Sequence, residues 1–111
     1  MRAGDLIRVD FGVPVGSEPG FVRPAVVVSA DAFLVHRPRT IHVVPVTSNV
    51  SRSLPSEVVV TSPNLVLASV AQCHLCAVIG VERLVGDEYG NVGAAELAQI
   101  RSVLGDLLDI G

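Results

Sequence analysis

Arg23 is the residue whose setting most clearly suggests chemistry. It follows the glycine- and proline-containing segment 16–20 and stands directly before the apolar run 24–28. Pro24 favours an extended backbone at Arg23 and starts a strand without a backbone donor. Arginine is always charged, and its planar fork of donors suits a phosphate group. The sequence therefore predicts that Arg23 holds a phosphate that is about to react.

A second polar cluster lies at the end of another apolar strand, where Thr47, Ser48 and Asn49 follow Pro45 and Val46. The hydroxyl of Thr47 is suited to bond a nonbridging phosphate oxygen or to position an attacking hydroxyl. Ser48 is a second hydroxyl donor beside it. With the arginine, this cluster predicts a site for phosphate chemistry at the ends of two strands.

Charge is distributed unevenly along the chain. The formal net charge is −3, which argues against a general nucleic-acid-binding protein. Residues 20–56 nevertheless hold four arginines and one acid, or +3, whereas residues 80–111 hold two arginines and six acids, or −4. This asymmetry predicts that one face meets a polyanion. Because the chain has no lysine, contacts to that polyanion fall to arginines, backbone amides and hydroxyls.

The length and composition indicate one globular domain spanning residues 1–111. Half of the residues are hydrophobic and the mean hydropathy is +0.56, so we expect surplus apolar surface to be buried in a homodimer. The longest apolar run, residues 75–79, is far shorter than the roughly 18 residues that span a bilayer. Residues 1–8 lack the apolar core of a signal peptide. We therefore expect a cytoplasmic protein with no membrane association.

Cys73 and Cys76 form a Cys-His-Leu-Cys stretch that raises the question of a metal or redox site. Residues 69–78 have the composition of a strand, in which positions three apart point to opposite faces. Structural zinc also takes four ligands, and the chain has no second pair of cysteines. We therefore expect no metal, no cofactor and no disulfide, only two small residues that are buried or lie at a sheet edge.

Short apolar runs separated by glycine, proline and polar residues predict a chain that is mostly β-strand. The expected strands are residues 5–11, 24–29, 40–46, 57–60 and 69–78, of which the last is the longest. Pro45 is expected to mark an edge or the end of its strand. The expected connections are long loops at 12–22 and 49–55, about one helical turn within 30–39, a turn or short helix at 81–84 and a turn at 87–90.

The end of the chain changes to a helical period. Its apolar residues fall on one face of a helix, namely Leu97, Ile100, Leu104, Leu107 and Leu108. Glu96 in the first turn suits the positive end of the helix dipole. Many short strands followed by one amphipathic helix predict a β-rich α+β fold, a small and partly open β-barrel with the helix packed on it.

Several motifs, in their order and spacing, resemble the MazF/PemK family of toxin endoribonucleases. They are Gly-Asp-Leu-Ile at 4–7, Val-Asp-Phe at 9–11, Gly-Ser-Glu at 16–18, Arg-Pro-Ala-Val-Val-Val-Ser at 23–29, Pro-Val-Thr-Ser at 45–48 and Val-Gly-Ala-Ala-Glu-Leu at 92–97. The resemblance covers nearly the whole chain. It implies an SH3-like barrel that forms a homodimer and cleaves single-stranded RNA at short sequences without a metal. It also implies a cognate antitoxin whose disordered tail occupies the RNA groove.

The resemblance also implies roles for individual residues. The family's catalytic arginine falls on Arg23 and its catalytic threonine on Thr47, and Glu18 matches a loop acid that shapes the site. RNA is expected to run beneath the loops 12–22 and 49–55. The residues expected to bind it are Glu18, Phe21, Ser48, Asn49 and Arg52.

Recognition of bases in single strands usually combines stacking with hydrogen bonds to the base edges. The chain has no tryptophan and one tyrosine, so Phe21 is the leading stacking candidate and Phe33 the second. Family members often carry a glutamine and, two residues later, a basic residue where this chain has Leu75 and Ala77. The base preference is therefore expected to differ from theirs. The loop that contains Arg52 is expected to carry sequence selectivity.

RNA carries its own nucleophile, because its 2′-hydroxyl can attack the adjacent phosphorus and leave a 2′,3′-cyclic phosphate and a 5′-hydroxyl end. Arg23 is suited to stabilise the charge that develops, whereas arginine gives up its proton too reluctantly to be a ready base. Histidine is the side chain best suited to proton transfer near neutral pH. None of His36, His42 and His74 matches a catalytic position of the family, so the resemblance assigns no general base.

Two other functions share this predicted fold. One is a non-enzymatic toxin resembling the CcdB gyrase poisons, which act through a carboxy-terminal helix. The ending 108–111 lacks the tryptophan that those poisons use there. The other is a paralogue that holds RNA or an antitoxin without cutting, which the apolar Leu75 and Ala77 would fit. The combination of Arg23 with Thr47 favours RNA cleavage over both.

Overall fold

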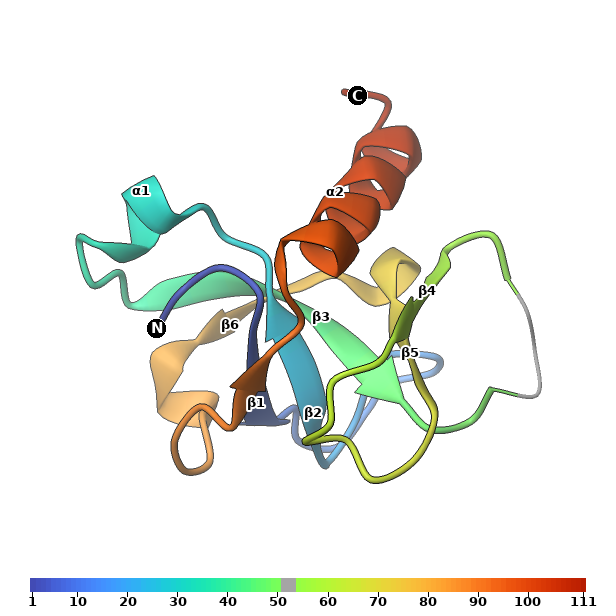
Figure 1. Ribbon diagram of the computed structural model, residues 1–111. Helices are drawn as coiled ribbons and strands as arrows, with labels where there is room; N and C mark the ends of the chain where they lie inside the picture. Colours follow the sequence, from blue (N-terminus) through green and yellow to red (C-terminus); the bar gives the residue numbers. More distant parts are fainter. Residues whose placement is uncertain (51–53) are drawn as a thin grey trace.

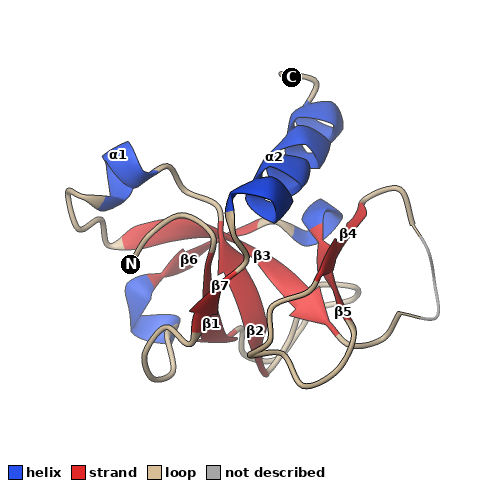
Figure 2. Ribbon diagram, viewed as in Figure 1, coloured by secondary structure: helices blue, strands red, loops and turns tan. Residues whose placement is uncertain are grey.

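The computed structural model describes residues 1–50 and 54–111, and within them one curled antiparallel sheet carries a long carboxy-terminal helix (Figure 1, Figure 2). The elements are β1 Asp5–Asp10, β2 Val22–Val27, α1 Asp31–Leu34, β3 Thr40–Thr47, β4 Glu57–Val60, β5 Ser69–Gln72, η1 Cys73–Leu75, β6 Ala77–Gly80, η2 Val81–Arg83, β7 Gly90–Asn91 and α2 Ala94–Leu108, where η marks a 3-10 turn. The predicted β-rich α+β fold is confirmed. The helical turn within 30–39 and the short helix at 81–84 are confirmed as well.

Strand β3 is the centre of the sheet. The strands pair in the order β4-β5-β3-β2-β1-β7, and β6 adds to β3 beside β5. One edge of β3 pairs with β2 over residues 43–45. The other edge pairs first with β6 over 40–43 and then with β5 over 46–47. Because two strands share one edge of β3, the sheet curls into a half-barrel.

Pro45 lies inside β3, which continues through Thr47. The carbonyl of His42 accepts a hydrogen bond from the Val28 amide on the β2 side, so the alternation of the strand turns the Pro45 nitrogen toward the opposite edge. There it falls between the stretches of β3 that pair with β6 and with β5, where no ladder donor is required. The expected edge or strand end is therefore wrong, and the proline marks a local gap in pairing.

The long strand expected over 69–78 is also wrong. The chain leaves the sheet after Gln72, forms the turn η1, in which the Cys76 amide donates to the Cys73 carbonyl at 3.1 Å, and rejoins β3 as β6. The break is required because β5 and β6 pair with different stretches of the same strand. Cys73 and Cys76 are therefore not positions of one strand; both are free thiols, the first buried and the second half-buried.

Both faces of the β1–β2–β3 region are buried, which explains why these strands read as nearly continuous apolar runs. The face toward α2 carries Leu6, Val26, Val44 and Val46, which pack with Ile100. The opposite face carries Ile7, Val9, Ala25, Val27, Ile41 and Val43, which pack with Leu34 and Ile79. The two cores hold the strands rigidly, so their ends are well placed to position functional side chains.

Helix α2 packs on the sheet mainly through its middle, where Val103 and Leu104 contact the core around Ile100. Ile100 is fully buried, and Nη2 of Arg101 donates to the Val28 carbonyl at 3.1 Å. Leu107 and Leu108 are 48% and 64% exposed, and the end of the helix projects beyond the sheet (Figure 1). The predicted apolar helix face is therefore covered only in part within one chain. Among the described residues, no helix is long and apolar enough to cross a membrane.

Replacing Ile100 by alanine is expected to lower the free energy of unfolding by about 2–5 kcal/mol, because it leaves a cavity between α2 and the sheet. Chemical denaturation measures the change. The matched control is Gln99→Ala, at the neighbouring exposed position of the same helix. A loss no larger than that of the control would contradict the packing described here.

Both thiols are expected to react slowly at neutral pH. Burial, with a smaller contribution from Cys76, raises the pKa of Cys73 to about 11, and burial also raises the pKa of Cys76. Only the thiolate attacks, so labelling by an aromatic disulfide reagent should accelerate as the pH rises toward these raised values. Comparing native with denaturant-unfolded protein over a pH series tests this. Fast labelling of native Cys73 at neutral pH would refute its burial.

Candidate active site

The two predicted catalytic residues meet at the ends of neighbouring strands. Arg23 is the second residue of β2 and lies opposite Val9, so it belongs to the strand instead of preceding it. The strand starts earlier than expected because β1 extends far enough to pair with it there. The β2–β3 ladder pairs Ala25 with Pro45, and two residues further this register sets Arg23 beside Thr47 on one face of the sheet.

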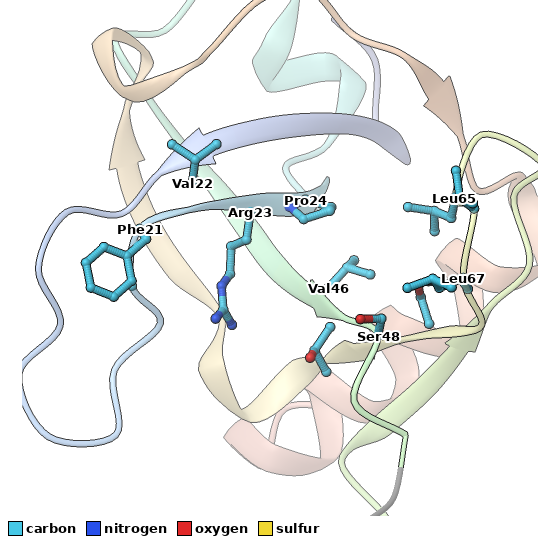
Figure 3. A pocket seen from close by; sticks show the side chains of 12 residues that line it. Phe21, Val22, Arg23, Pro24, Val46, Ser48, Leu65 and Leu67 are labelled. Carbon is cyan, nitrogen blue, oxygen red and sulfur yellow. Dashed lines mark hydrogen bonds between the residues drawn. The ribbon is translucent and has the colours of Figure 1, made fainter.

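A groove of about 510 Å³ runs across these strand ends (Figure 3). Its lining residues come from three segments of the chain: Gly20, Phe21, Val22, Arg23 and Pro24; Val46, Thr47 and Ser48; and Leu65, Val66, Leu67 and Ser69. The first two segments were expected at the site. The third, the loop between β4 and β5, was missed, although its apolar side chains form one wall of the groove.

The apolar loop wall carries a signal that sequence reasoning did not use. Val66 is 96% exposed, and Leu67 is also exposed. Apolar residues in a loop between two short strands have no structural reason to face solvent, and a groove wall that meets a ligand supplies one. Leu65 and Leu67 face the opening of the groove across from β2 (Figure 3).

Arg23 is the cation of this groove. Its side chain extends between Phe21 and Ser48 (Figure 3). The Nε atom is buried and has no hydrogen-bond partner among the described residues. The ion pair found within those residues joins the Met1 amino group to Glu88 at 3.3 Å, so no carboxylate neutralises Arg23. A buried donor without a partner is unfavourable, and an anionic oxygen would satisfy it.

Phe21 stands at the groove with its ring 64% exposed. Its backbone is left-handed, with φ of 59°, which is uncommon for a bulky residue. Two hydrogen bonds across the base of the 12–20 loop hold it there: the Phe21 amide donates to Gly12 at 2.7 Å, and its carbonyl accepts from Phe11 at 2.9 Å. These bonds fix the backbone from which the exposed Phe21 side chain projects, and an exposed aromatic side chain at the groove is suited to stack on a base.

Thr47, Ser48 and Asn49 occupy adjoining places at the end of β3. The Thr47 Oγ1 atom accepts a hydrogen bond from the Asn49 amide at 3.1 Å, which leaves the hydroxyl proton to be donated elsewhere. Ser48 lines the groove with Arg23. Asn49 lines a second, smaller hollow of about 100 Å³ that shares Thr47 with the groove. We call this hollow the side pocket; it is lined by Thr47, Asn49, Leu54, Glu57, Gln72 and His74.

Glu18 and Asn49, two of the predicted RNA-binding residues, do not line the groove. Glu18 accepts a hydrogen bond from the Val15 amide at 2.9 Å and so fixes the shape of its own loop. It lines a separate hollow with Phe11, Pro19 and Arg83. Its part in RNA binding stays a prediction. Arg52 lies outside the described residues.

The histidines and the second aromatic candidate lie in different parts of the fold. His74 lines the side pocket beside Thr47, and its Nδ1 atom is 2.9 Å from the Ser56 hydroxyl. His36 follows α1, and His42 lies near the start of β3, so neither lines the groove. Phe33 is in α1, away from the groove. The sequence could not separate these positions because their spacing says nothing about which strand ends meet.

The two residues at which this chain departs from the family pattern also lie off the groove. Leu75 ends the turn η1, and Ala77 begins β6 and lines the hollow next to Glu18. Within residues 1–50 and 54–111, no three His, Cys, Asp or Glu side chains gather in a way that could hold a metal ion. The groups of the groove that can take part in chemistry are its arginine and hydroxyl groups.

Comparison with known proteins agrees with this geometry. Residues 2–108 match the family described as the PemK-like, MazF-like toxin of type II toxin–antitoxin systems. The chain is 40% identical, over an alignment 116 positions long, to a Mycobacterium tuberculosis protein named Endoribonuclease MazF9; the alignment covers 99% of this chain and 98% of that protein.

Solved structures show the same fold. MazF from Deinococcus radiodurans superposes with a TM-score of 0.84 at 28% identity, covering 98% of this chain and 96% of that one. A MazE–MazF structure from the same organism gives a TM-score of 0.77 at 26% identity, covering 100% of this chain and 97% of that one. Since the family match spans nearly every element that builds the groove, this chain belongs to the PemK-like, MazF-like toxins of type II toxin–antitoxin systems.

Proposed function

We propose that this toxin is an endoribonuclease that cuts single-stranded RNA in the groove between β2, β3 and the β4–β5 loop. The observation that carries the proposal is the buried, unpartnered Nε of Arg23 beside the Thr47 hydroxyl. An arginine that lacks an acidic partner and lines a groove with hydroxyl groups suits a phosphodiester. The name of its M. tuberculosis relative, an endoribonuclease, supports the same reaction.

The reaction needs the RNA, this site and solvent water. The 2′-oxygen forms a bond to the adjacent phosphorus and gives its proton to water, and the bond from phosphorus to the 5′-oxygen breaks as that oxygen takes a proton from water. The products are a 2′,3′-cyclic phosphate and a 5′-hydroxyl end. Extra negative charge develops on the phosphorane oxygens, and the guanidinium of Arg23 is the group that stabilises it. One preorganised donor of this kind typically contributes about 3–4 kcal/mol to the transition state.

Thr47 positions the phosphate for this attack. Its Oγ1 is fixed by the Asn49 amide, and its free proton is suited to a nonbridging oxygen or to the 2′-oxygen. The flanking bases would meet the Phe21 ring on one side and the apolar wall of Leu65 and Leu67 on the other. Ser48 adds a further donor within the groove.

The proposal includes an antitoxin partner and a homodimer. The MazE–MazF structures among the similar folds support a cognate antitoxin. Its place in this groove is part of the proposal. The exposed apolar end of α2, with Leu107, Leu108 and Ile110, supports a homodimer. An RNA substrate and such an antitoxin would be met in the cytoplasm, and this supports a cytoplasmic location for the toxin.

Arg23→Ala is expected to reduce RNA cleavage by a hundredfold to a thousandfold, about 3–4 kcal/mol, because the developing charge loses its stabilising donor. Purified protein is incubated with a long, weakly structured RNA in excess EDTA, and the 5′ ends of the products are mapped. The matched control is Arg39→Ala, an exposed arginine before the opposite end of β3. Equal cleavage by Arg23→Ala and the wild type would overturn the assignment, and no cleavage by folded wild type would overturn the function.

Thr47→Val is expected to lower turnover by roughly tenfold to a hundredfold while changing RNA affinity much less, since a hydrogen bond to a charged group contributes about 1.5–3 kcal/mol. Single-turnover cleavage and equilibrium binding of the same RNA separate the two effects. Thr40→Val, at the exposed first position of the same strand, is the control. A loss confined to affinity would show that Thr47 holds the RNA without assisting the reaction.

A further inference from the structure

The side pocket adjoins the groove at Thr47 and has its own chemical character. Its volume of about 100 Å³ corresponds to roughly three water molecules at about 30 Å³ each. It therefore has room for the edge of one planar ring but not for a whole nucleotide. Its lining includes an amide, a carboxylate and an imidazole, from Gln72, Glu57 and His74.

The strand register sets the functional groups in one row across the sheet. Thr47 lies opposite Val70, and Gln72 is two residues further along β5, so both project from the same face as diagonal neighbours about 7–8 Å apart. Gln72 lies directly opposite Glu57 of β4, with side chains about 4.5–5.5 Å apart at their Cβ atoms. The row thus runs from Arg23 through Thr47 and Gln72 to Glu57.

The polar groups on either side of Thr47, from Arg23 and Gln72, differ in hydrogen-bonding character. Among the described residues, two buried side-chain polar atoms lack a hydrogen-bond partner: Nε of Arg23 and Oε1 of Gln72. The first is a donor and suits an anionic oxygen. The second is an acceptor and suits an N–H group. One ligand that offers a phosphate and, next to it, an N–H donor would satisfy both atoms at once.

We propose that the side pocket is a subsite for the nucleobase next to the scissile phosphate, and that it selects a base by the N–H donors on its edge. This inference rests on the proposed RNA-cleaving function. The acceptors are the Gln72 Oε1 atom and the Glu57 carboxylate. The carboxylate is held by the Leu54 amide, which donates to its Oε1 atom at 3.1 Å.

This pair of acceptors discriminates among bases. Guanine offers adjacent N–H groups at N1 and N2 on its Watson–Crick edge, so it can satisfy both acceptors. Uracil offers one N–H between two carbonyl oxygens. When that N–H bonds one acceptor, a carbonyl oxygen faces the carboxylate and is repelled by it. Cytosine and adenine each offer one amino group and fall between. The structure therefore assigns guanine as the favoured base and uracil as the disfavoured one.

His74 completes the pocket from its rim. Its imidazole is exposed to solvent, and its Nδ1 atom pairs with the Ser56 hydroxyl at 2.9 Å, which holds the ring orientation. A ring fixed in this way offers a face against which an inserted base can lie. His74 thereby positions the base, and the two acceptors read it.

The test compares base preference in the wild type, Gln72→Leu and Gln99→Leu. Gln72→Leu removes the Oε1 acceptor with little change in side-chain volume. Gln99→Leu makes the same change on the exposed face of α2. Each protein cuts a pool of short RNAs randomised along their length, and the products are sequenced. The wild type should favour guanine over uracil at one position beside the cut. Gln72→Leu should reduce that preference by roughly tenfold at that position alone.

Two further arms keep the outcomes distinct. Gln72→Glu retains an acceptor oxygen and should keep the guanine preference, whereas circular dichroism checks that every variant is folded. Binding of the same pool to each protein, with a 2′-deoxy sugar at the cut, reads the preference without turnover. An unchanged preference in Gln72→Leu, or an equal loss in Gln99→Leu, would refute the subsite. Absence of any cutting by the wild type would instead refute the ribonuclease function, and the binding arm would still decide the subsite.

Discussion

Strand β3 must pair with three neighbours, with β2 along one edge and with β6 and then β5 along the other. This sharing makes the sheet curl, forces the chain out of the sheet at η1, and leaves a gap that Pro45 fills without losing a ladder donor. It also sets the start of β2 beside the end of β3, and the end of β3 beside β5 and β4, along one rim. The groove and the side pocket both lie on that rim, so the site is a consequence of the pairing of β3.

The chemistry of the rim comes from polar side chains whose hydrogen-bonding groups find no partner in the apolar cores. Strands with apolar side chains on both faces run through the two cores, and the polar residues follow where the ladders end. Most buried polar atoms in folded proteins have partners, so the exceptions are informative. Here the exceptions, within the described part of the chain, are one donor and one acceptor on either side of Thr47. The fold leaves them to be satisfied by a ligand that carries both kinds of group.

The row from Arg23 to Glu57 contains two kinds of residue: some belong to the motifs shared with the family, and others do not. Arg23 and Thr47 match the family motifs that span nearly the whole chain. Gln72 and Glu57 were not singled out by any motif, yet they extend the same row across β5 and β4. In the proposed site, the reaction lies at one end of the row and base selection at the other, and the two ends lie on different strands.

Much of this molecule follows from local pattern. The alternation of the strands, the helical period from Leu97 to Leu108, and the motifs around Arg23 and Thr47 were sufficient to predict a β-rich α+β toxin fold and to name the central pair. Each of these signals depends on residues a few positions apart, whose backbone preferences and burial are encoded by neighbouring side chains.

What the sequence could not decide depends on pairing between distant segments. The apolar run 69–78 is compatible with one strand, and only the need of β3 for two partners on one edge divides it at Cys73. In the same way, the loop with Val66 and Leu67 becomes a groove wall, and Gln72 meets Glu57, because strand register sets which residues lie opposite each other. Local pattern therefore predicted the fold class, most of the elements and the proposed catalytic pair, whereas pairing between distant segments decided where the strands break and which other side chains surround that pair.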